Sequence, residues 1–330
     1  MALVGSGLGG SVGVAAEATY GTFVVPTRWP EFESETLKWV PKVVTGKAIN
    51  GGLAPSLAQR VVTSSMVQGE LKTYAFQSGL GIFFEQLFGS STIAQQGATN
   101  AWLQTHTIGD VAGKSLSLQV NRPDTAKGDH PYSYSGLKVS QMLLECGLDE
   151  IAALTLSFLG KQLSTSEALT APAPVAGNAP FHFAQGVITA GAIGSEAEVL
   201  SVTKASTTIK RGFDDKRFPI GGAGLMAEPT QNAWMDAGGT FDTEFINSTD
   251  WETAYNTQAP LSAYLTFTGP VISGTYNYEL KLWFPNIAFD DGGPEIAGPD
   301  ILKPSYKWTA YDDGTHGLCT LTYQTTDTAI

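Results

Sequence analysis

Cysteine and histidine are both scarce in this chain, with two cysteines and four histidines in 330 residues. None of the histidines stands at a metal-ligand spacing from another histidine or from a cysteine, so the sequence predicts no metal site. Cys146 and Cys319 each alternate with apolar residues in a strand-like pattern. We therefore expect two buried free thiols and no disulfide.

Long hydrophobic runs are also missing, because no stretch approaches the roughly 18 consecutive apolar residues that a membrane span needs. The first ten residues lack the basic region and the apolar region of a secretory signal. The sequence thus predicts no membrane contact, and we expect the chain to fold in the cytoplasm where it is made.

Positive charge is in short supply. The formal net charge is −12, and residues 166–330 hold 8 Lys and Arg against 19 Asp and Glu, whereas residues 1–165 hold 11 against 12. Such a surface repels phosphate and disfavours ordinary DNA binding. The second half of the chain supplies nearly all of the acidity.

Signatures of catalysis and of cofactor binding are absent from the sequence. Gly5 to Gly10 satisfies the G-x-G-x-x-G spacing, but no strand precedes it and no helical pattern follows, so it predicts a flexible segment and no dinucleotide site. No strand-to-helix nucleophile elbow is present, and the Asp-Gly pairs are typical of turns. We expect a protein that is not an enzyme and binds no cofactor; a β-hydrolase is the least favoured alternative.

What the chain does contain is a series of segments whose side chains alternate at period two, the pattern of half-buried β-strands. The expected strands cover residues 37–44, 60–76, 115–120, 136–148, 152–160, 199–210, 239–247, 262–269, 276–284, 305–311 and 318–325.

One helix is expected in each half. Residues 80–88 place apolar side chains at i, i+3, i+4, i+7 and i+8, with Ser78 as the expected cap and Gly89 as the stop. In the second half, Thr249 to Glu252 is a capping-box pattern that opens a shorter helix. Both helices are expected to lie against a sheet.

The two halves correspond in pattern, which indicates a tandem duplication. Residues 69–76 and the following helix match 239–246 and the following helix, residues 115–123 match 277–285, and 155–158 match 320–323. The acidic turns at 149–150 and 312–313 correspond in the same way. The sequence predicts four parts: an N-terminal arm at 1–30, a first module at 31–162, a linker at 163–179 and a second module at 180–330.

The segment from Gly13 to Trp29, followed by the expected strand at 35–44, resembles the opening of phage tail tube proteins. It contains a Gly-Val pair, then Glu17-x-x-Tyr20-Gly21-Thr22, and then Pro26. Further on, YSGLKVSQMLLE, LTLSFLGK, PFHF, LKLWFP and GPDIL each resemble their counterparts in order. Residues 211–216 are more charged than that family leads one to expect.

The resemblance implies a mainly β fold of two tandem β-sandwich or half-barrel modules, each flanked by one α-helix. It implies a structural virion protein, made in the host cytoplasm, that assembles into stacked rings forming the tail tube. Its partners would be other copies of itself, the tape measure protein and the tail terminator or tip proteins, with double-stranded DNA passing through without specific binding. Three two-module chains per pseudo-sixfold ring are favoured, and six chains are the alternative.

Unpaired strand edges in such modules favour pairing with neighbouring modules, which would close a barrel. The Gly-rich loop between the first two strands offers candidates for contact between rings: Gly46, Lys47, Ile49, Asn50, Leu53 and Pro55. Acidic candidates for the lumen or the outer surface are Asp149, Glu150, Asp242, Glu244, Asp312 and Asp313. A tandem β-domain carbohydrate-binding or adhesin protein, suggested by seven Trp and eleven Tyr, is the alternative.

Overall fold

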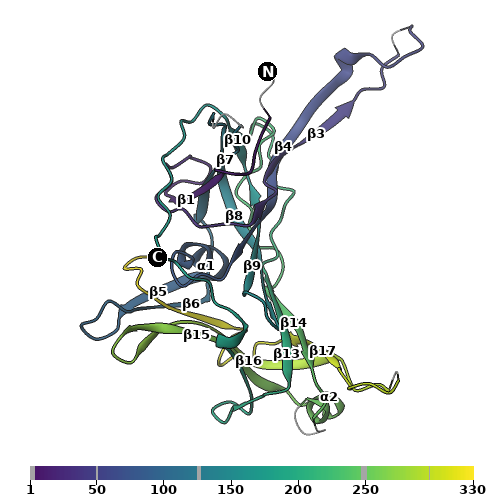
Figure 1. The fold of residues 1–330 in the computed structure, drawn as a ribbon. Helices are drawn as coiled ribbons and strands as arrows, with labels where there is room; N and C mark the ends of the chain where they lie inside the picture. Colours follow the sequence, from purple (N-terminus) through teal and green to yellow (C-terminus); the bar gives the residue numbers. More distant parts are fainter. Residues whose placement is uncertain (1–3, 50, 125–127, 247–250, 297) are drawn as a thin grey trace.

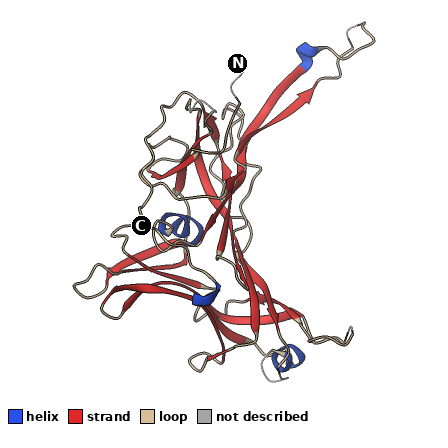
Figure 2. Cartoon of the chain, in the orientation of Figure 1, coloured by secondary structure: helices blue, strands red, loops and turns tan. Residues whose placement is uncertain are grey.

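The computed structural model describes residues 4–330 apart from 50, 125–127, 247–250 and 297. The fold is mainly β, with two α-helices and all the strands linked by antiparallel pairing (Figures 1 and 2). Cys146 and Cys319 are buried free thiols, as predicted. The helices in the described part of the chain fall short of the length and hydrophobicity that a membrane-spanning helix needs.

Among its described residues, the first half of the chain has ten strands, one α-helix and one short 3-10 helix. They are β1 (Ser11–Glu17), β2 (Ser34–Glu35), β3 (Lys38–Thr45), η1 (Leu57–Gln59), β4 (Arg60–Tyr74), α1 (Gly81–Phe88), β5 (Gly89–Gln95), β6 (Trp102–Ile108), β7 (Ser115–Asn121), β8 (Pro131–Gly147), β9 (Ala153–Gly160) and β10 (Gln162–Ser164).

The part of the second half that the structure describes has eight strands, one α-helix and one 3-10 helix. They are η2 (Phe183–Gln185), β11 (Gly186–Gly191), β12 (Ala197–Glu198), β13 (Val202–Lys210), β14 (Asp236–Thr243), α2 (Glu252–Thr257), β15 (Leu261–Ser273), β16 (Tyr276–Asp291), β17 (Ser305–Ala310) and β18 (Thr320–Thr325). Each strand expected from the sequence is present, with its ends shifted by a few residues.

Both halves pair their strands in the same order. The first half runs β1–β7–β8–β9–β4–β3, with β10 also on β8. The second runs β11–β15–β16–β17–β14–β13, with β18 also on β16. In both halves the helix follows the equivalent strand, α1 after β4 and α2 after β14.

The registers repeat along with the order. The β8–β9 pair has an irregularity between Val139 and Gln141, and the equivalent β16–β17 pair has one between Phe289 and Asp291. Likewise, β7 shifts against β8 between Leu116 and Leu118, as β15 shifts against β16 between Leu261 and Ala263. Two unrelated sheets have no reason to share the positions of their bulges, which are specific features of a strand pair.

These pairings change part of the correspondence expected from the sequence. The match between 69–76 and 239–246 holds, because those residues lie in and just after β4 and β14. Residues 115–121 in β7 are instead equivalent to β15, and 155–158 in β9 to β17, one strand earlier than the pattern indicated. Alternation looks alike in neighbouring strands, so a match by pattern can slip by one strand.

The N-terminal segment, expected to be an arm, contains a buried strand. β1 pairs along its whole length with β7, and Val12, Val14 and Ala15 are at most 2% exposed. β1 is the equivalent of β11 in the repeated order, so the first half begins before residue 31. Of the expected linker, residues 163–164 belong to β10, and residues 165–179 contain no helix or strand.

Two strand pairings join the halves. Residues 141–147 of β8 pair with 204–210 of β13, and β6 pairs with β18. β5 and β6 form a hairpin that has no equivalent after α2, so the first half lends two strands to the edge of the second (Figure 1). The edges of the two halves therefore complete each other within one chain.

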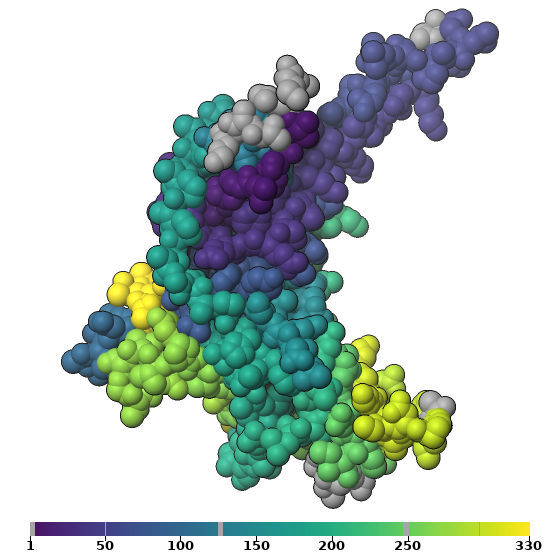
Figure 3. All heavy atoms as spheres, in the orientation of Figure 1, coloured from purple at the N-terminus to yellow at the C-terminus, as the bar shows by residue number. Residues whose placement is uncertain are grey.

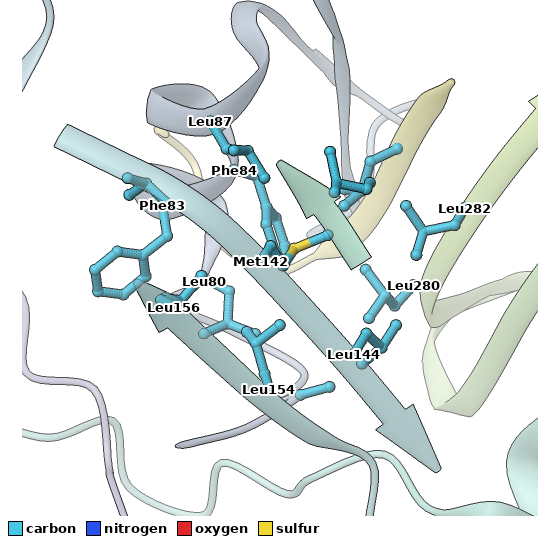
Figure 4. Close-up of a cluster of buried hydrophobic side chains, with 14 of the residues drawn as sticks. Leu80, Phe83, Phe84, Leu87, Met142, Leu144, Leu154, Leu156, Leu280 and Leu282 are labelled. Carbon is cyan, nitrogen blue, oxygen red and sulfur yellow. The ribbon is translucent and has the colours of Figure 1, made fainter. Parts of the chain in front are cut away.

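The core is shared in the same way. Figure 4 shows Phe83, Phe84 and Leu87 of α1 packed over β8 and β9, with β16 of the second half close by. These side chains are at most 1% exposed, and burying side chains of this size contributes about 1.5–3 kcal/mol each. The other labelled residues of the cluster are Leu80, Met142, Leu144, Leu154, Leu156, Leu280 and Leu282.

The caps of the helices differ from the expectation. α1 begins after Leu80 without a side-chain cap, because the Ser78 hydroxyl bonds with Thr325 instead, at 3.1 Å. Gly89 does end the helix, with φ 89°. In the second half, Trp251 precedes α2; the expected capping residue, Thr249, lies outside the described residues.

A buried histidine lies where β6 meets β5 and β18. His106 is fully buried, its Nδ1 lies 2.7 Å from the Ser91 hydroxyl oxygen, and the Phe84 ring packs against it edge-on at 5.6 Å. Burial, with a smaller contribution from Lys114, lowers the pKa of His106 to about 3. The ring is therefore neutral in the folded protein at ordinary pH.

This histidine makes the fold sensitive to acid. Below a pH of about 6.5 the unfolded chain binds a proton at His106 that the folded chain excludes, so stability is lost as the pH falls. We expect a loss of about 2 kcal/mol between pH 7 and pH 5 from this residue. In urea denaturation at both pH values, His106→Gln should flatten the dependence, whereas the exposed His182→Gln should not; equal slopes for the wild type and His106→Gln would contradict the assignment.

Candidate functional site

One face of the central sheet is polar and open to solvent. Along β4, β9, β8, β13, β14 and β17, alternate side chains are buried in the core, and those between them point to the other side. One row across this second side consists of Glu70, Ser157, Gln141, Lys210 and Asp236. We call this side the polar face; it crosses both halves without a break.

Each lysine that the second half places on the polar face stands opposite an aspartate. Lys204 pairs across the strands with Asp242, and Lys210 with Asp236. Lys307 pairs with Asp291 of β16. In the first half, Lys72 lies 3.0 Å from Glu33, which raises the pKa of that lysine. Opposite charges at facing strand positions attract each other, so the strand register sets a carboxylate across from each of these lysines of the second half.

The structure gathers four of the six acidic candidates at one end of the polar face. Asp149 and Glu150 form the exposed turn between β8 and β9, and Asp242 and Glu244 lie at the end of β14. The β8–β13 and β13–β14 pairings bring these ends together.

The other two acidic candidates lie elsewhere. Asp312 and Asp313 are in the exposed loop between β17 and β18, where Asp313 accepts a hydrogen bond from His316 at 2.8 Å. That bond, together with backbone donors, lowers the pKa of Asp313. These two residues are thus fixed within a local turn, outside the strands that form the polar face.

The candidates for contact between rings lie on a projecting hairpin. Figures 1 and 3 show β3 and β4 extending well beyond the body of the molecule; we call residues 42–62 the hairpin arm. Gly46, Lys47, Ile49, Leu53 and Pro55 are exposed there, whereas Asn50 lies outside the described residues. Other exposed apolar side chains on the arm are Val44, Leu57, Val61 and Val62. Such a concentration of exposed apolar side chains is typical of an interaction surface.

Glu17 is a buried hydrogen-bond acceptor at the end of β1. One carboxylate oxygen accepts from the backbone of Gly21 at 2.8 Å and from Ser115 at 2.6 Å. The other accepts from Ser117 at 2.7 Å and from the backbone of Gly136 at 2.8 Å. A buried carboxylate is tolerated where donors surround it in this way, so Glu17 ties together β1, β7 and β8.

The residues around Glu17 explain the spacing of the Glu-x-x-Tyr-Gly segment. Gly21 has φ 74°, and a side chain there would collide with Lys161. The Tyr20 ring lies against Gly136 and under the Lys161 ammonium, 5.6 Å away. Burial raises the pKa of Tyr20. These residues build a joint of the fold.

Arg211 explains part of the unexpected charge at 211–216. Its guanidinium is buried and donates to the carbonyl oxygens of Leu87 and Phe88 at 2.9 Å each, and to that of Gly109 at 3.0 Å. The first two carbonyls end α1, where a cation is favoured. Sequence reasoning missed this role and that of Glu17; for Arg211, a charge directly after the predicted strand at 199–210 was the available signal.

The chain is thus a mainly β protein that presents an open polar sheet face and a projecting hairpin arm. The family model of the phage tail tube protein matches residues 7–310, and the chain belongs to this family. It is therefore a structural component of a bacteriophage tail. Membership in this family favours a tail tube protein over the alternative of a carbohydrate-binding or adhesin protein. No curated protein matches the chain.

The Glu17 joint predicts a strong effect of a minimal substitution. In Glu17→Gln an amide NH₂ replaces one of the two carboxylate oxygens. The NH₂ cannot accept the two hydrogen bonds that this oxygen accepts, so two buried donors lose their acceptor. We expect the free energy of unfolding to fall by about 2–4 kcal/mol. Glu198→Gln, on an exposed strand, is the matched control and should change it by less than about 0.5 kcal/mol. A similar small change for both variants in urea denaturation would contradict the role of Glu17.

Proposed function

We propose that the chain assembles with other copies of itself into stacked rings that form the tail tube, the conduit for genome delivery. The observation that carries this proposal is the repeated pairing order: one chain contains two equivalent β units that are already joined edge to edge through β8 and β13. A sheet that grows by adding equivalent units closes when the first unit meets the last, which removes its exposed edges.

The repeated order also bears on how many chains form a ring. Each chain supplies two equivalent β units with their helices, so a ring of six units takes three chains. The tandem modules expected from the sequence agree with this arrangement, with β1 included in the first. Six chains per ring is the alternative, in which only one unit of each chain would line the channel.

The polar face is the wall that DNA would meet in this arrangement. It is continuous across both units, and its opposite side is the apolar core, so it is the surface that a closed sheet turns toward a wet interior. From the sequence, acidic residues were candidates for the lumen or the outer surface. The polar face carries acidic residues and lysines together, and each lysine of the second half stands opposite an aspartate.

Compensated lysines fit a channel through which DNA must slide. A lysine that pairs with a phosphate releases a counterion and adds affinity, and a ring repeats each such lysine in every chain. An aspartate directly opposite competes with the phosphate for that lysine. The acidic turn at Asp149 and Glu150 would repel the duplex at one end of the wall.

The hairpin arm is the part of the chain best placed to reach the neighbouring ring. Its exposed apolar side chains would be covered there, and its length allows contact beyond the body (Figure 3). The tape measure protein inside the tube and the terminator and tip proteins at its ends are the further partners that membership in the family supports.

The number of chains per ring can be measured directly. Mass photometry or native mass spectrometry of single rings should give three copies of the 34.9 kDa chain. The purified protein should also form tubes of constant diameter in negative-stain micrographs at high concentration. A six-chain ring would overturn the three-chain arrangement, and a protein that stays monomeric at every concentration would overturn the assembly itself.

Charge compensation on the wall predicts a gain of DNA affinity when the aspartates are neutralised. Asp236→Asn with Asp242→Asn leaves Lys210 and Lys204 unopposed while keeping similar side-chain shapes. We expect intact tubes, slower DNA ejection from reconstituted phage, and a delay that shrinks as salt increases. Asp312→Asn, in the loop away from the polar face, should leave ejection unchanged. Equal ejection rates for the double variant and this control would refute the compensation.

A further inference from the structure

The junction between the two halves has a definite register. Gln141 of β8 stands opposite Lys210 of β13, and Cys146 stands opposite Ala205. Within this junction, Met142 and Ile209 face each other in the core and are at most 1% exposed. A chain that repeats its units has a second copy of each side of this junction.

In the second half, the segment equivalent to the β8 side of the junction lies directly after β16. The shared bulge places Asp291 at the position of Gln141, so residues 292–296 are equivalent to 142–146. Among the described residues, no strand pairs with 292–296. Ile296 takes the place of Cys146; it is 85% exposed, whereas Cys146 is 6% exposed.

In the first half, the segment equivalent to the β13 side of the junction consists of β2 and the start of β3. Glu35 pairs with Leu71 and Lys38 with Gln68, as Ala205 pairs with Phe241 and Thr208 with Gly238. The outer edge of β2 and β3, the one turned away from β4, pairs with no strand in the described part of the chain.

Trp39 on this edge takes the place of Ile209. It is 43% exposed, whereas Ile209 is fully buried. Each of the two unpaired sides thus carries an exposed apolar side chain at a position that is buried in the junction between β8 and β13.

We propose that residues 291–296 of one copy pair antiparallel with residues 35–40 of the next copy, in the register of the β8–β13 junction. Asp291 then stands opposite Val40, and Glu295 opposite Thr36. This inference rests on the proposed ring, and it assigns the surface through which one chain joins the next.

Side-chain size and charge fit this register. Trp39 stands opposite Gly292, where the internal junction has Ile209 opposite Met142, so a large side chain meets a small one. Lys38 lies between Asp291 and Glu295 of the neighbouring copy on the polar side, which repeats the compensation of lysine by carboxylate. Ile296 and Trp39 turn to the core side, as Cys146 and Ile209 do.

Two glycines allow the backbone of residues 291–296 to change its path when it pairs. Gly292 and Gly293 have φ 148° and 128°, so in the single chain the backbone leaves the sheet after Asp291. Glycine moves between such values and ordinary strand values without a steric penalty. Pro294 offers no backbone donor, so the pair has one hydrogen bond fewer than its internal counterpart.

Engineered cysteines test the register. In the proposed pairing, Val40→Cys and Asp291→Cys of neighbouring chains have Cα atoms about 4.5–5.5 Å apart, within the reach of a disulfide. In the control, Val40→Cys with Glu295→Cys, the partners are displaced by four residues, about 13 Å. The native thiols are buried. Under mild oxidation of assembled protein, we expect at least tenfold more linked chains for the first pair, ending at a closed species of three.

A second variant guards against effects of the cysteines themselves. Ile296→Asp should raise the concentration needed for assembly at least tenfold without changing the circular dichroism of the monomer, because the new carboxylate must enter the core side of the junction. Ile220→Asp, at a fully exposed position, should leave assembly unchanged. Tubes that form without the in-register link, or an Ile296→Asp variant that assembles like the control, would overturn this register and leave the ring intact. Failure of the unsubstituted chain to assemble would overturn the proposed function itself.

Discussion

The hydrogen-bonding requirement of strand edges is the constraint on which this structure depends. β8 illustrates it: one edge is paired with β9 and β10, and the other first with β7 and then with β13. An unpaired buried backbone group costs about as much as a lost hydrogen bond, so a long strand must find partners along its whole length. β8 finds its last partner in the other half of the chain. The two halves are consequently inseparable parts of one sheet system, and their core is continuous across the junction.

Strands with apolar alternation could be found from the sequence, and those with an unusual inward face could not. β6 was missed because it turns Gln104 and His106 into the core, where both are fully buried. β1 was missed because four consecutive residues, 12–15, are buried, so both faces of the strand are covered and no alternation shows in the sequence. The alternation rule registers hydrophobic contrast. It has no signal for a polar side chain that tertiary packing buries.

The candidate site could be predicted only in part from the sequence, for a similar reason. Composition located the acidity in the second half, and the loop at 46–55 was recognised as a surface element by its glycines. Which lysine stands opposite which aspartate depends on strand register, and register depends on turns and bulges far along the chain. The Glu17 joint depends on donors from residues about a hundred positions away. A single sequence carries no mark of such pairings.

The loops that follow the two equivalent strands have taken different forms. In the first half, the link from β3 to β4 is the projecting arm (Figure 1). In the second, the link from β13 to β14 folds back, with Arg211 anchored on α1 and Gly224 bonded to Ser65. Because both forms belong to one polypeptide, they are always made in equal number, and in the proposed ring, where one chain joins the next head to tail, they would alternate. Two separate genes would need a recognition code to achieve that order; here translation alone imposes it, and each loop is free to diversify without disturbing the other.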